Sequence, residues 1–531
     1  MDRNNFSFLK RIIIFRLSVS ETRYCLSIIR LNVGLIVSKK AREMLGDELL
    51  VSIFNDGEIA YVAEYGDFME KDLKENGVNA LVVVSESENR DIKDFLSNID
   101  ELTNIHPLSV EVLDINWLQS REQAKALILA YLSKASLSFL ARRVQPLRNK
   151  NLTRRSLLRR KLYYYKPYPV LSQEISFERE MKYLSSLCEL VVKTPEGPQV
   201  SDPDKCTSCG FCSGMSFLGY LEMPNFSTDQ VIAFINTLSN YAPKDKPGIV
   251  LITCNRITDI PKLREAYIYP LISPCVSSVH DSFLTAILVS GFYPVLYSPD
   301  SSCELRDRAK IRAEVAIKRF PGTEIWFPYV EDLNELEDVL RNIVRDSTIL
   351  TRNEIPQDIV LSRSRRRNLL LWSISQFRSQ SKLNEEDEIP GVFKVVVDPD
   401  KCVLCGVCVR SCQMLVFDIK NTSNSTTLYH DLSYCIGSQR CVRNCPEGAI
   451  TLMGSVKIKE LGNRSVVSAT VGKCKYCGKP LDSIKVKNRV GEILMSSGIN
   501  DIEDYVDVCN DCKQKNMSKK WVERTLGLSK K

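Results

Sequence analysis

The first part of the chain alternates short apolar runs with segments of helical period. Between about residue 25 and residue 140, the runs 49–54 and 80–84 predict buried strands. Residues 67–76, closed by a glycine, and residues 118–132 carry apolar side chains at helical spacing. Strands and helices that alternate in this way predict an α/β unit with a mostly parallel sheet.

A second stretch, residues 226–346, has the same organisation. It contains predicted strands at 249–254, 267–272 and 293–297 and a predicted helix at 281–290. Because the carboxyl ends of parallel strands share one edge of a sheet, ligands of open α/β sheets bind there. Three thiols at or just beyond these strand ends are therefore expected to converge: Cys254, Cys275 and Cys303.

Two connecting stretches are polar and charged: 141–187, which is basic, and 347–392. Residues 141–173 contain ten Lys or Arg and no acidic residue, and a second basic run spans 363–367. We expect solvated linkers, the second containing a helix, with contact to an acidic protein partner as the next alternative. Nucleic acid is not expected, because no base-stacking aromatic pattern accompanies the charge. The three tyrosines at 163–165 are expected to pack against a neighbouring domain.

The cysteines from 402 to 445 have the spacing of a two-cluster bacterial ferredoxin. The first run is C-x2-C-x2-C-x3-C, and the second, separated from it by 22 residues, ends in Cys445-Pro446. A four-iron cube needs four thiolates and one C-x2-C-x2-C loop supplies three, so the last cysteine of each run ligates the other cluster. The first predicted cluster has these ligands: Cys402, Cys405, Cys408 and Cys445.

The second cluster of this region has three cysteine ligands in the sequence: Cys412, Cys435 and Cys441. Ser438 stands where the regular pattern has a fourth cysteine. Either this cluster contains three irons, or Ser438, a water molecule or another side chain caps the fourth iron. Seven cysteines in a structural zinc or disulfide framework are the less favoured interpretation.

A shorter copy of the motif lies upstream, at Cys206, Cys209 and Cys212. Ser216 occupies the position of the next cysteine, and Cys188 lies 18 residues before Cys206. In a ferredoxin, a cysteine at that separation is the fourth ligand of the same cluster. We therefore predict a half-ferredoxin with one four-iron cluster; in the alternative, Cys188 is an ordinary buried residue and the cluster has three protein thiolates.

The C-terminal region contains two C-x2-C pairs separated by 31 residues. Four thiolates in this arrangement predict a tetrahedral metal site that closes the C-terminus structurally. Zinc is the expected ion, while a single iron, as in rubredoxin, or a further cluster are alternatives. The predicted ligands are Cys474, Cys477, Cys509 and Cys512.

Composition narrows the class of protein. The chain has 531 residues, enough for three or four domains, a net charge of +7 and 19 cysteines. In a chain of this length, grouped cysteines indicate metal ligation in a reducing compartment rather than a secreted disulfide framework. The three histidines argue against histidine-based metal catalysis and a Ser-His-Asp triad, and each is expected to be a packed or surface residue: His106, His280 and His430.

The sequence gives no reason to expect a membrane span or a signal peptide. Residues 6–16 are apolar but are interrupted by three basic side chains, so a strand, or a few residues ahead of the first domain, is expected there. No run of 18 apolar residues occurs in the chain. We expect a cytoplasmic protein.

Residues 67–85 and 121–126 resemble the N-terminal domain of the A subunit of heterodisulfide reductase. Glu86 stands where that family usually has a cysteine. The family continues into a flavin domain that opens with G-x-G-x-x-G, and no G-x-G occurs in this chain, so flavin is not expected.

Residues 226–346 resemble the delta subunit of methyl-viologen-reducing hydrogenase, which passes electrons to heterodisulfide reductase. Ile257 and Ser298 stand where that family has further cysteines. The resemblance implies either a two-iron cluster or, as the preferred interpretation, a docking domain whose three cysteines are buried remnants.

Together these patterns predict a multi-domain α/β plus α+β protein that transfers electrons. We expect a subunit of a heterodisulfide-reductase-like or hydrogenase-like complex in an archaeal-type cytoplasm, with a flavin-bearing or reductase-like catalytic subunit and a ferredoxin-type donor as partners. One alternative is a catalytic reductase of disulfides or sulfur compounds that uses the three strand-end thiols. The other is a redox-sensing regulator whose basic segments bind nucleic acid.

Seven segments are predicted: an α/β domain at 1–140, a basic linker at 141–187, a half-ferredoxin at 188–225, an α/β domain at 226–346, a linker with a helix at 347–392, a two-cluster ferredoxin domain at 393–456 and a four-cysteine domain at 457–531.

Overall fold

The computed structural model describes residues 30–66, 70–149, 163–172, 178–257, 259–299, 302–317, 327–346, 350–360, 365–379, 384–412, 416–435, 437–498 and 506–525. The apolar stretch at 6–16 lies outside these residues. The chain divides into two compact units, residues 1–383 and residues 384–531. Among the residues described, no helix is both long enough and apolar enough to cross a membrane.

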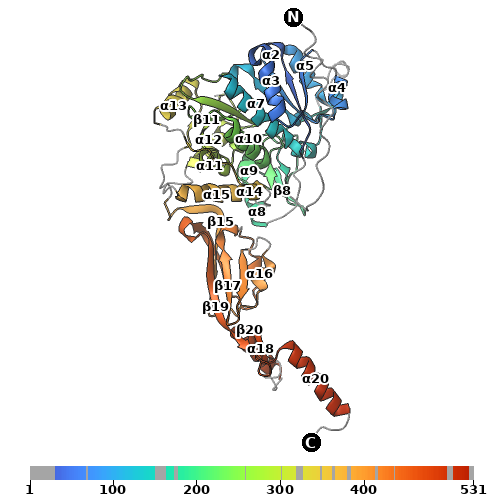
Figure 1. Ribbon diagram of the computed structural model, residues 1–531, viewed down its shortest axis with the longest axis vertical. Coiled ribbons are helices and arrows are strands. Elements are labelled where there is room, and N and C mark those ends of the chain that lie inside the picture. The colour runs from blue at the N-terminus through green and yellow to red at the C-terminus, as the bar shows by residue number, and fades with distance from the viewer. Residues whose placement is uncertain are drawn as a thin grey trace. The chain divides into compact units, whose positions relative to one another are not determined.

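The first unit begins with a parallel sheet in the order β2-β1-β3-β4. Its strands are β1 (Val33–Val37), β2 (Ile59–Glu64), β3 (Ala80–Ser85) and β4 (Val110–Asp114). The helices of this part are α2 (Lys39–Leu45), α3 (Asp47–Asp56), α4 (Glu70–Glu75), α5 (Arg90–Ser97), α6 (Ile99–Leu102) and α7 (Arg121–Ser136). The prediction of a parallel α/β unit is confirmed (Figure 1).

The prediction of a strand at 49–54 is wrong, because these residues lie in α3. Leu50 and Ile53, three positions apart, are the buried side chains of that helix, as an amphipathic helix requires. Asp47 and Glu48 occupy its first turn, where carboxylates interact favourably with the helix dipole.

A second parallel sheet, in the order β12-β11-β13-β14, follows in the same unit. Its strands are β11 (Gly248–Cys254), β12 (Tyr267–Ser273), β13 (Tyr293–Tyr297) and β14 (Tyr329–Val330). Its helices are α10 (Thr228–Tyr241), α11 (Asp281–Val289), α12 (Arg306–Ile317), α13 (Leu333–Asp346), α14 (Gln357–Val360) and α15 (Arg365–Ser379). The predicted strands and the predicted helix of this region are confirmed.

The two sheets share one hydrophobic core. Helices α7 and α10 lie against each other within it (Figure 1). The ring of Tyr131 on α7 contacts that of Phe234 on α10 edge to face, with 5.4 Å between centroids. Its hydroxyl donates to the carbonyl oxygen of Pro270 on β12 at 3.1 Å. The buried Tyr131 therefore joins the first part of the unit to the second sheet through both an apolar and a polar contact.

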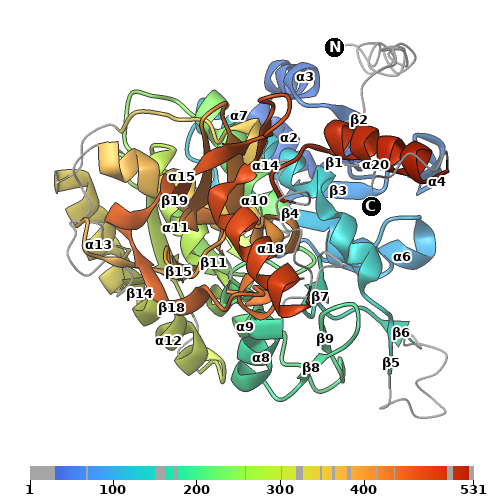
Figure 2. The same ribbon diagram turned by 90° about the horizontal axis from the view of Figure 1, so that it is seen from below.

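Short elements connect the two sheets: β5 (Leu147–Arg148), β6 (Tyr163–Tyr164), β7 (Val170–Leu171), α8 (Glu178–Leu187), β8 (Val191–Lys193), β9 (Pro198–Val200), α9 (Phe211–Gly214) and β10 (Leu221–Glu222). Those from β7 to α9 lie close together (Figure 2). Only part of the tyrosine run is packed. Tyr163 and Tyr164 are exposed, whereas the ring of Tyr165 lies against that of His106, with 4.4 Å between the ring centroids. His280 is buried and accepts the backbone N–H of Ser282 at the start of α11.

The prediction of a solvated basic run at 363–367 is wrong for Arg366 and Arg367, which are 0% and 3% exposed. Both lie on α15, whose Leu369 and Leu370 are also buried and which packs along α11. The two arginines lie on the same face of α15 as these buried leucines, so the packing of that face places their side chains in the interior. Helix α15 is therefore part of the folded unit rather than a connector.

The second unit contains two antiparallel sheets, β15-β18 and β16-β17-β19-β20. The strands are β15 (Glu388–Val397), β16 (Phe417–Asn421), β17 (Ser425–Asp431), β18 (Ile450–Lys457), β19 (Asn463–Lys473) and β20 (Pro480–Ser483). The helices are α16 (Val407–Ser411), α17 (Arg440–Arg443), α18 (Ile484–Ser496) and α20 (Asn510–Thr525). The pairing of β15 with β18 joins the lead-in of the first cysteine run to the strand that follows the second.

Candidate metal centres

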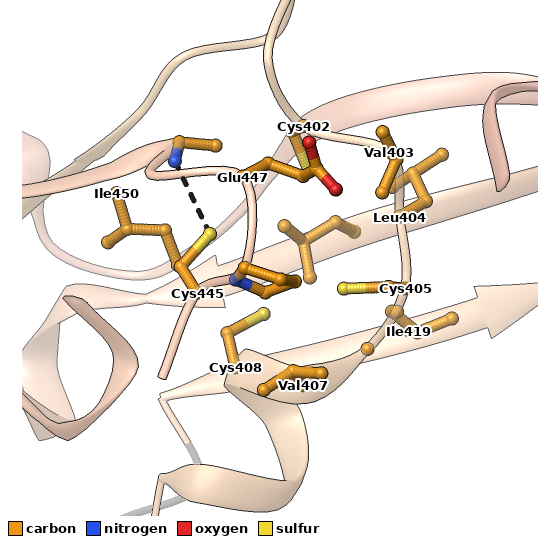
Figure 3. Close-up of a pocket in the computed structure, with 14 residues that line it drawn as sticks. Cys402, Val403, Leu404, Cys405, Val407, Cys408, Ile419, Cys445, Glu447 and Ile450 are labelled. Atoms are coloured by element: carbon orange, nitrogen blue, oxygen red, sulfur yellow. Dashed lines mark hydrogen bonds between the residues drawn. The ribbon is translucent and has the colours of Figure 1, made fainter. Parts of the chain in front are cut away.

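Four cysteines of the second unit surround one pocket, and they are the four predicted for the first ferredoxin cluster: Cys402, Cys405, Cys408 and Cys445. Their sulfur atoms face a common centre (Figure 3). The rest of the lining is almost entirely apolar: Val403, Leu404, Val407, Ile419, Leu428, Pro446, Ala449 and Ile450, with the side chain of Glu447. An apolar pocket with four converging thiols fits the donor set of a four-iron cluster.

The backbone of the first cysteine loop explains this convergence. Leu404 and Gly406, on either side of Cys405, have positive φ values of 64° and 70°. Left-handed residues that alternate with right-handed ones turn successive N–H groups to one side and form a concavity for an anion, as at many iron–sulfur sites. This left-handed backbone conformation costs a non-glycine residue about 1–2 kcal/mol of free energy. Other interactions of the loop must offset that cost at Leu404.

The same backbone pattern occurs in two other loops of the chain. Ser208 and Gly210 flank Cys209 with φ values of 59° and 66°, and Gly437 and Gln439 flank Ser438 with 70° and 62°. In each loop the second of these residues is the N-cap of a short helix: α9, α16 or α17. The three loops are therefore structural repeats, and Ser438 occupies the position of the middle cysteine.

The predicted ligands of the second cluster lie near one another. Burial and the neighbouring thiols of Cys435 and Cys412 raise the pKa of Cys441 to about 11. Ser438 is partly exposed in its loop. The structure thus brings together the three predicted cysteines and places Ser438 at the middle position of the neighbouring loop.

The upstream cysteines are also neighbours. Burial raises the pKa of Cys212, and the nearby thiols of Cys209, Cys188 and Cys206 raise it further. Cys188 follows the end of α8 and borders the apolar cluster that contains Cys212. The hydroxyl of Ser216, at the position of the next cysteine, accepts the backbone N–H of Tyr220 at 3.0 Å.

The upstream loop is fixed against the second parallel sheet. A Cβ added at Gly214 would clash with the backbone carbonyl oxygen of Ser277, so only glycine allows this approach. The hydroxyl of Ser277 hydrogen-bonds the carbonyl oxygen of Cys209 at 2.5 Å and lies 3.3 Å from the sulfur of Cys275. The loop is therefore built into the edge of the sheet instead of standing apart as an independent half-ferredoxin.

Arg366 supports this loop from within the unit. Its guanidinium donates to the carbonyl oxygens of Ser213 and Ser216 at the end of α9. It also lies 3.3 Å from a carboxylate oxygen of Glu222 and donates to Thr228 Oγ1 at 2.9 Å. The last carbonyl oxygens of a helix have no hydrogen-bond partner within the helix, so they need other donors when they are buried. Sequence reasoning missed this residue, because a run of arginines gives no indication of which member is internal.

The three strand-end cysteines lie where the sheet topology predicts. Cys254 is the last residue of β11 and pairs with Ser273, two positions before Cys275, while Cys303 follows β13. Burial raises the pKa of both Cys254 and Cys275. These two thiols are therefore protonated near neutral pH. An activated cysteine, in contrast, lies in an exposed and electropositive environment that lowers its pKa.

The C-terminal cysteines form a tight group. The sulfurs of Cys474, Cys477, Cys509 and Cys512 all lie within 4.8 Å of one another, and those of Cys477 and Cys509 are 3.6 Å apart. A Zn–S distance of about 2.3 Å in a tetrahedron requires sulfurs about 3.8 Å apart. The backbone N–H of Cys509 donates to Cys474 and lowers its pKa to about 6. This geometry fits a single tetrahedral ion.

Comparison with known proteins supports iron–sulfur binding at the first cysteine run. Residues 395–416, which contain the first cysteine run, match the model of a family described as the 4Fe-4S binding domain. No curated protein matches the chain. The chain therefore contains a 4Fe-4S binding domain, with the general role in iron–sulfur electron transfer that such a domain supports.

Proposed function

We propose that the protein is an electron-transfer subunit that relays electrons through three iron–sulfur centres to and from other subunits of a heterodisulfide-reductase-like or hydrogenase-like complex. The observation that carries this proposal is the convergence of four cysteines in the apolar pocket of the first centre, within the matched domain. The repeat of the same loop conformation at two other places extends it to further centres.

Each centre has its own ligand set in this proposal. The first is held by Cys402, Cys405, Cys408 and Cys445, and the upstream one by Cys188, Cys206, Cys209 and Cys212. The second ferredoxin centre has Cys412, Cys435 and Cys441, with Ser438 at the remaining corner. The cysteines ligate the metal, while hydrogen bonds and charges around the sulfurs set each potential.

Electron relay is favoured over thiol catalysis by the setting of the strand-end cysteines. Cys275 is buried and the pKa of its thiol is raised, so it is a poor nucleophile at neutral pH. One contact favours the catalytic alternative. The hydroxyl of Ser277 contacts both the carbonyl oxygen of Cys209 and the sulfur of Cys275, and so connects this thiol with the upstream loop. Disulfide reduction by the purified chain that falls in a Cys275→Ser variant would support catalysis.

A nucleic-acid role is less well supported. Arg366 and Arg367, the part of the basic run that the structure describes with side chains, are buried and cannot contact phosphates. Duplex DNA binding that weakens steeply with salt is the result that would favour it.

Partners are inferred from what the chain does not encode. No G-x-G loop occurs in the sequence, so flavin chemistry is assigned to another subunit. Residues 226–346 resemble the hydrogenase delta subunit. We assign the docking of such a partner to the sheet edge in this region that carries Cys254 and Cys275.

The test is metal analysis of the full chain, purified without oxygen, combined with electron paramagnetic resonance. We expect about 11 or 12 irons per chain, corresponding to two four-iron clusters and a third of three or four irons. A Cys408→Ser variant should lose the signal of the first centre alone. A wild-type chain without iron, or one in which reduced clusters pass no electrons to a one-electron acceptor, contradicts the proposal.

A further inference from the structure

A charged side chain touches one ligand sulfur of the upstream centre. Arg308, in the first turn of α12, places its Nη1 3.0 Å from the sulfur of Cys209. Helix α12 packs against both α9 and the turn at 276–278, so its first turn borders the cysteine loop. A charged donor at this distance makes a hydrogen bond roughly twice as strong as a neutral one.

The first ferredoxin centre has different neighbours. The sulfur of Cys445 accepts a neutral backbone N–H from Ala449 at 3.3 Å. Arg410, on the helix that follows the loop, donates to the carbonyl oxygen of Cys405 at 3.4 Å and not to its sulfur. The carboxylate-bearing side chain of Glu447 also lines this pocket (Figure 3). Arg489 pairs with this carboxylate at 3.0 Å.

Two lysines lie at corresponding places before the two loops. Lys166 donates to the carbonyl oxygen of Asp204, before the upstream loop. Lys485 donates to the carbonyl oxygen of Pro399, at the corresponding place before the first ferredoxin loop. These lysines match, and the other charges described at the two loops are paired, Arg366 with Glu222 and Glu447 with Arg489. The contact of Arg308 with a ligand sulfur is therefore the difference on which the comparison of the two centres rests.

A cluster with four thiolates is an anion that gains a further negative charge on reduction. A cation bonded to a ligand sulfur stabilises the reduced form more than the oxidised form and so raises the reduction potential. We propose that Arg308 raises the reduction potential of the upstream centre above that of the first ferredoxin centre, so that electrons shared by the two centres collect at the upstream one.

This inference rests on the proposed function, because it needs a cluster at both centres. In each transfer the first ferredoxin centre loses one electron and the upstream centre gains it, and no covalent bond or proton changes place.

The experiment is a redox titration of the full, cluster-loaded chain monitored by electron paramagnetic resonance. A Cys206→Ser variant first assigns the signal of the upstream centre, and a Cys408→Ser variant that of the first ferredoxin centre. We expect the upstream centre to have the higher potential in the wild type. Arg308→Gln should lower that potential, Arg308→Lys should lower it less, and the first ferredoxin centre should stay unchanged in both.

Lys310→Gln is the matched control, since Lys310 is an exposed cation on the same helix. A shift in Arg308→Gln no larger than in this control, or a wild-type upstream centre below the other in potential, overturns the inference while the relay stands. If Cys206→Ser loses no iron, the upstream centre is absent, and both the inference and that part of the proposed function fail.

Discussion

The guanidinium of Arg443 donates a hydrogen bond to the carbonyl oxygen of Ser438 at 3.4 Å. Arg410 makes the same bond to Cys405, also at 3.4 Å and also five residues back along the chain. The bond holds the middle residue of each loop from the helix that follows. Ser438 is therefore held in its loop in the same way as Cys405 is held in the first ferredoxin loop.

Restoring the thiol should complete the second ferredoxin centre. In a Ser438→Cys variant we expect one more iron per chain, or, if the wild type already has four irons there, an unchanged iron content and a shifted potential. Iron and sulfide analysis together with electron paramagnetic resonance separates these results. Ser438→Ala is the control: an iron content equal to that of the wild type shows that the hydroxyl is not a ligand.

Cys188 should prove to be the fourth ligand of the upstream centre. Replacing it with alanine removes one of four thiolates, so we expect loss of that cluster, a decrease of about four irons per chain. Ser216→Ala is the matched control, because its hydroxyl is occupied by the N–H of Tyr220 and its loss should leave iron unchanged. Full iron content in Cys188→Ala would leave the centre with three protein thiolates.

Arg366 should matter for stability far more than Arg378, an exposed arginine of the same helix. Removing it leaves the buried carboxylate of Glu222 without its cation, which costs about 3–5 kcal/mol in the free energy of unfolding. Chemical denaturation of Arg366→Met, followed for the first unit, measures this. Arg378→Met, on an exposed position of the same helix, should change stability by less than about 0.5 kcal/mol.

A double variant sharpens this test. Combining Arg366→Met with Glu222→Leu removes both charges, so the double variant should be more stable than Arg366→Met alone. Equal or lower stability would mean that the hydrogen bonds of Arg366 to the carbonyl oxygens of Ser213 and Ser216 dominate its contribution.

The C-terminal site should hold one ion independently of the clusters. Cys477→Ser should remove about one zinc per chain, with iron content and cluster signals unchanged. Cys303→Ser, outside any predicted group of four, is expected to leave zinc unchanged. A visible rubredoxin-like absorption that disappears with Cys477 would identify the ion as iron.

Cysteine spacing predicted the first ferredoxin set, because the tight loop that makes three thiols converge requires that spacing. The strands β11, β12 and β13 were predictable as well, since a fully buried parallel strand is a continuous apolar run. The same rule failed at 49–54, where a short apolar run is compatible with a strand or a helix. Gly46 and the acidic residues after it were the local signal for α3.

Contacts between distant residues could not be predicted in this way. Arg366 bonds to residues 138 to 153 positions away, and Arg308 lies 99 positions from Cys209. Sequence periodicity records only whether a side chain faces the interior of its own element. Which buried partner an arginine meets is decided by how the elements pack, and that information is not local.

The contact of Arg366 with the upstream loop has a consequence for the order of events during biosynthesis. The ribosome makes the chain from its N-terminus, so residues 206–216 emerge long before the arginine that supports them. Until residue 366 has been translated and α15 has docked, the carbonyl oxygens of Ser213 and Ser216 have no guanidinium to bind. The loop that carries Cys206, Cys209 and Cys212 therefore acquires this structural support only late in translation, when most of the first unit already exists.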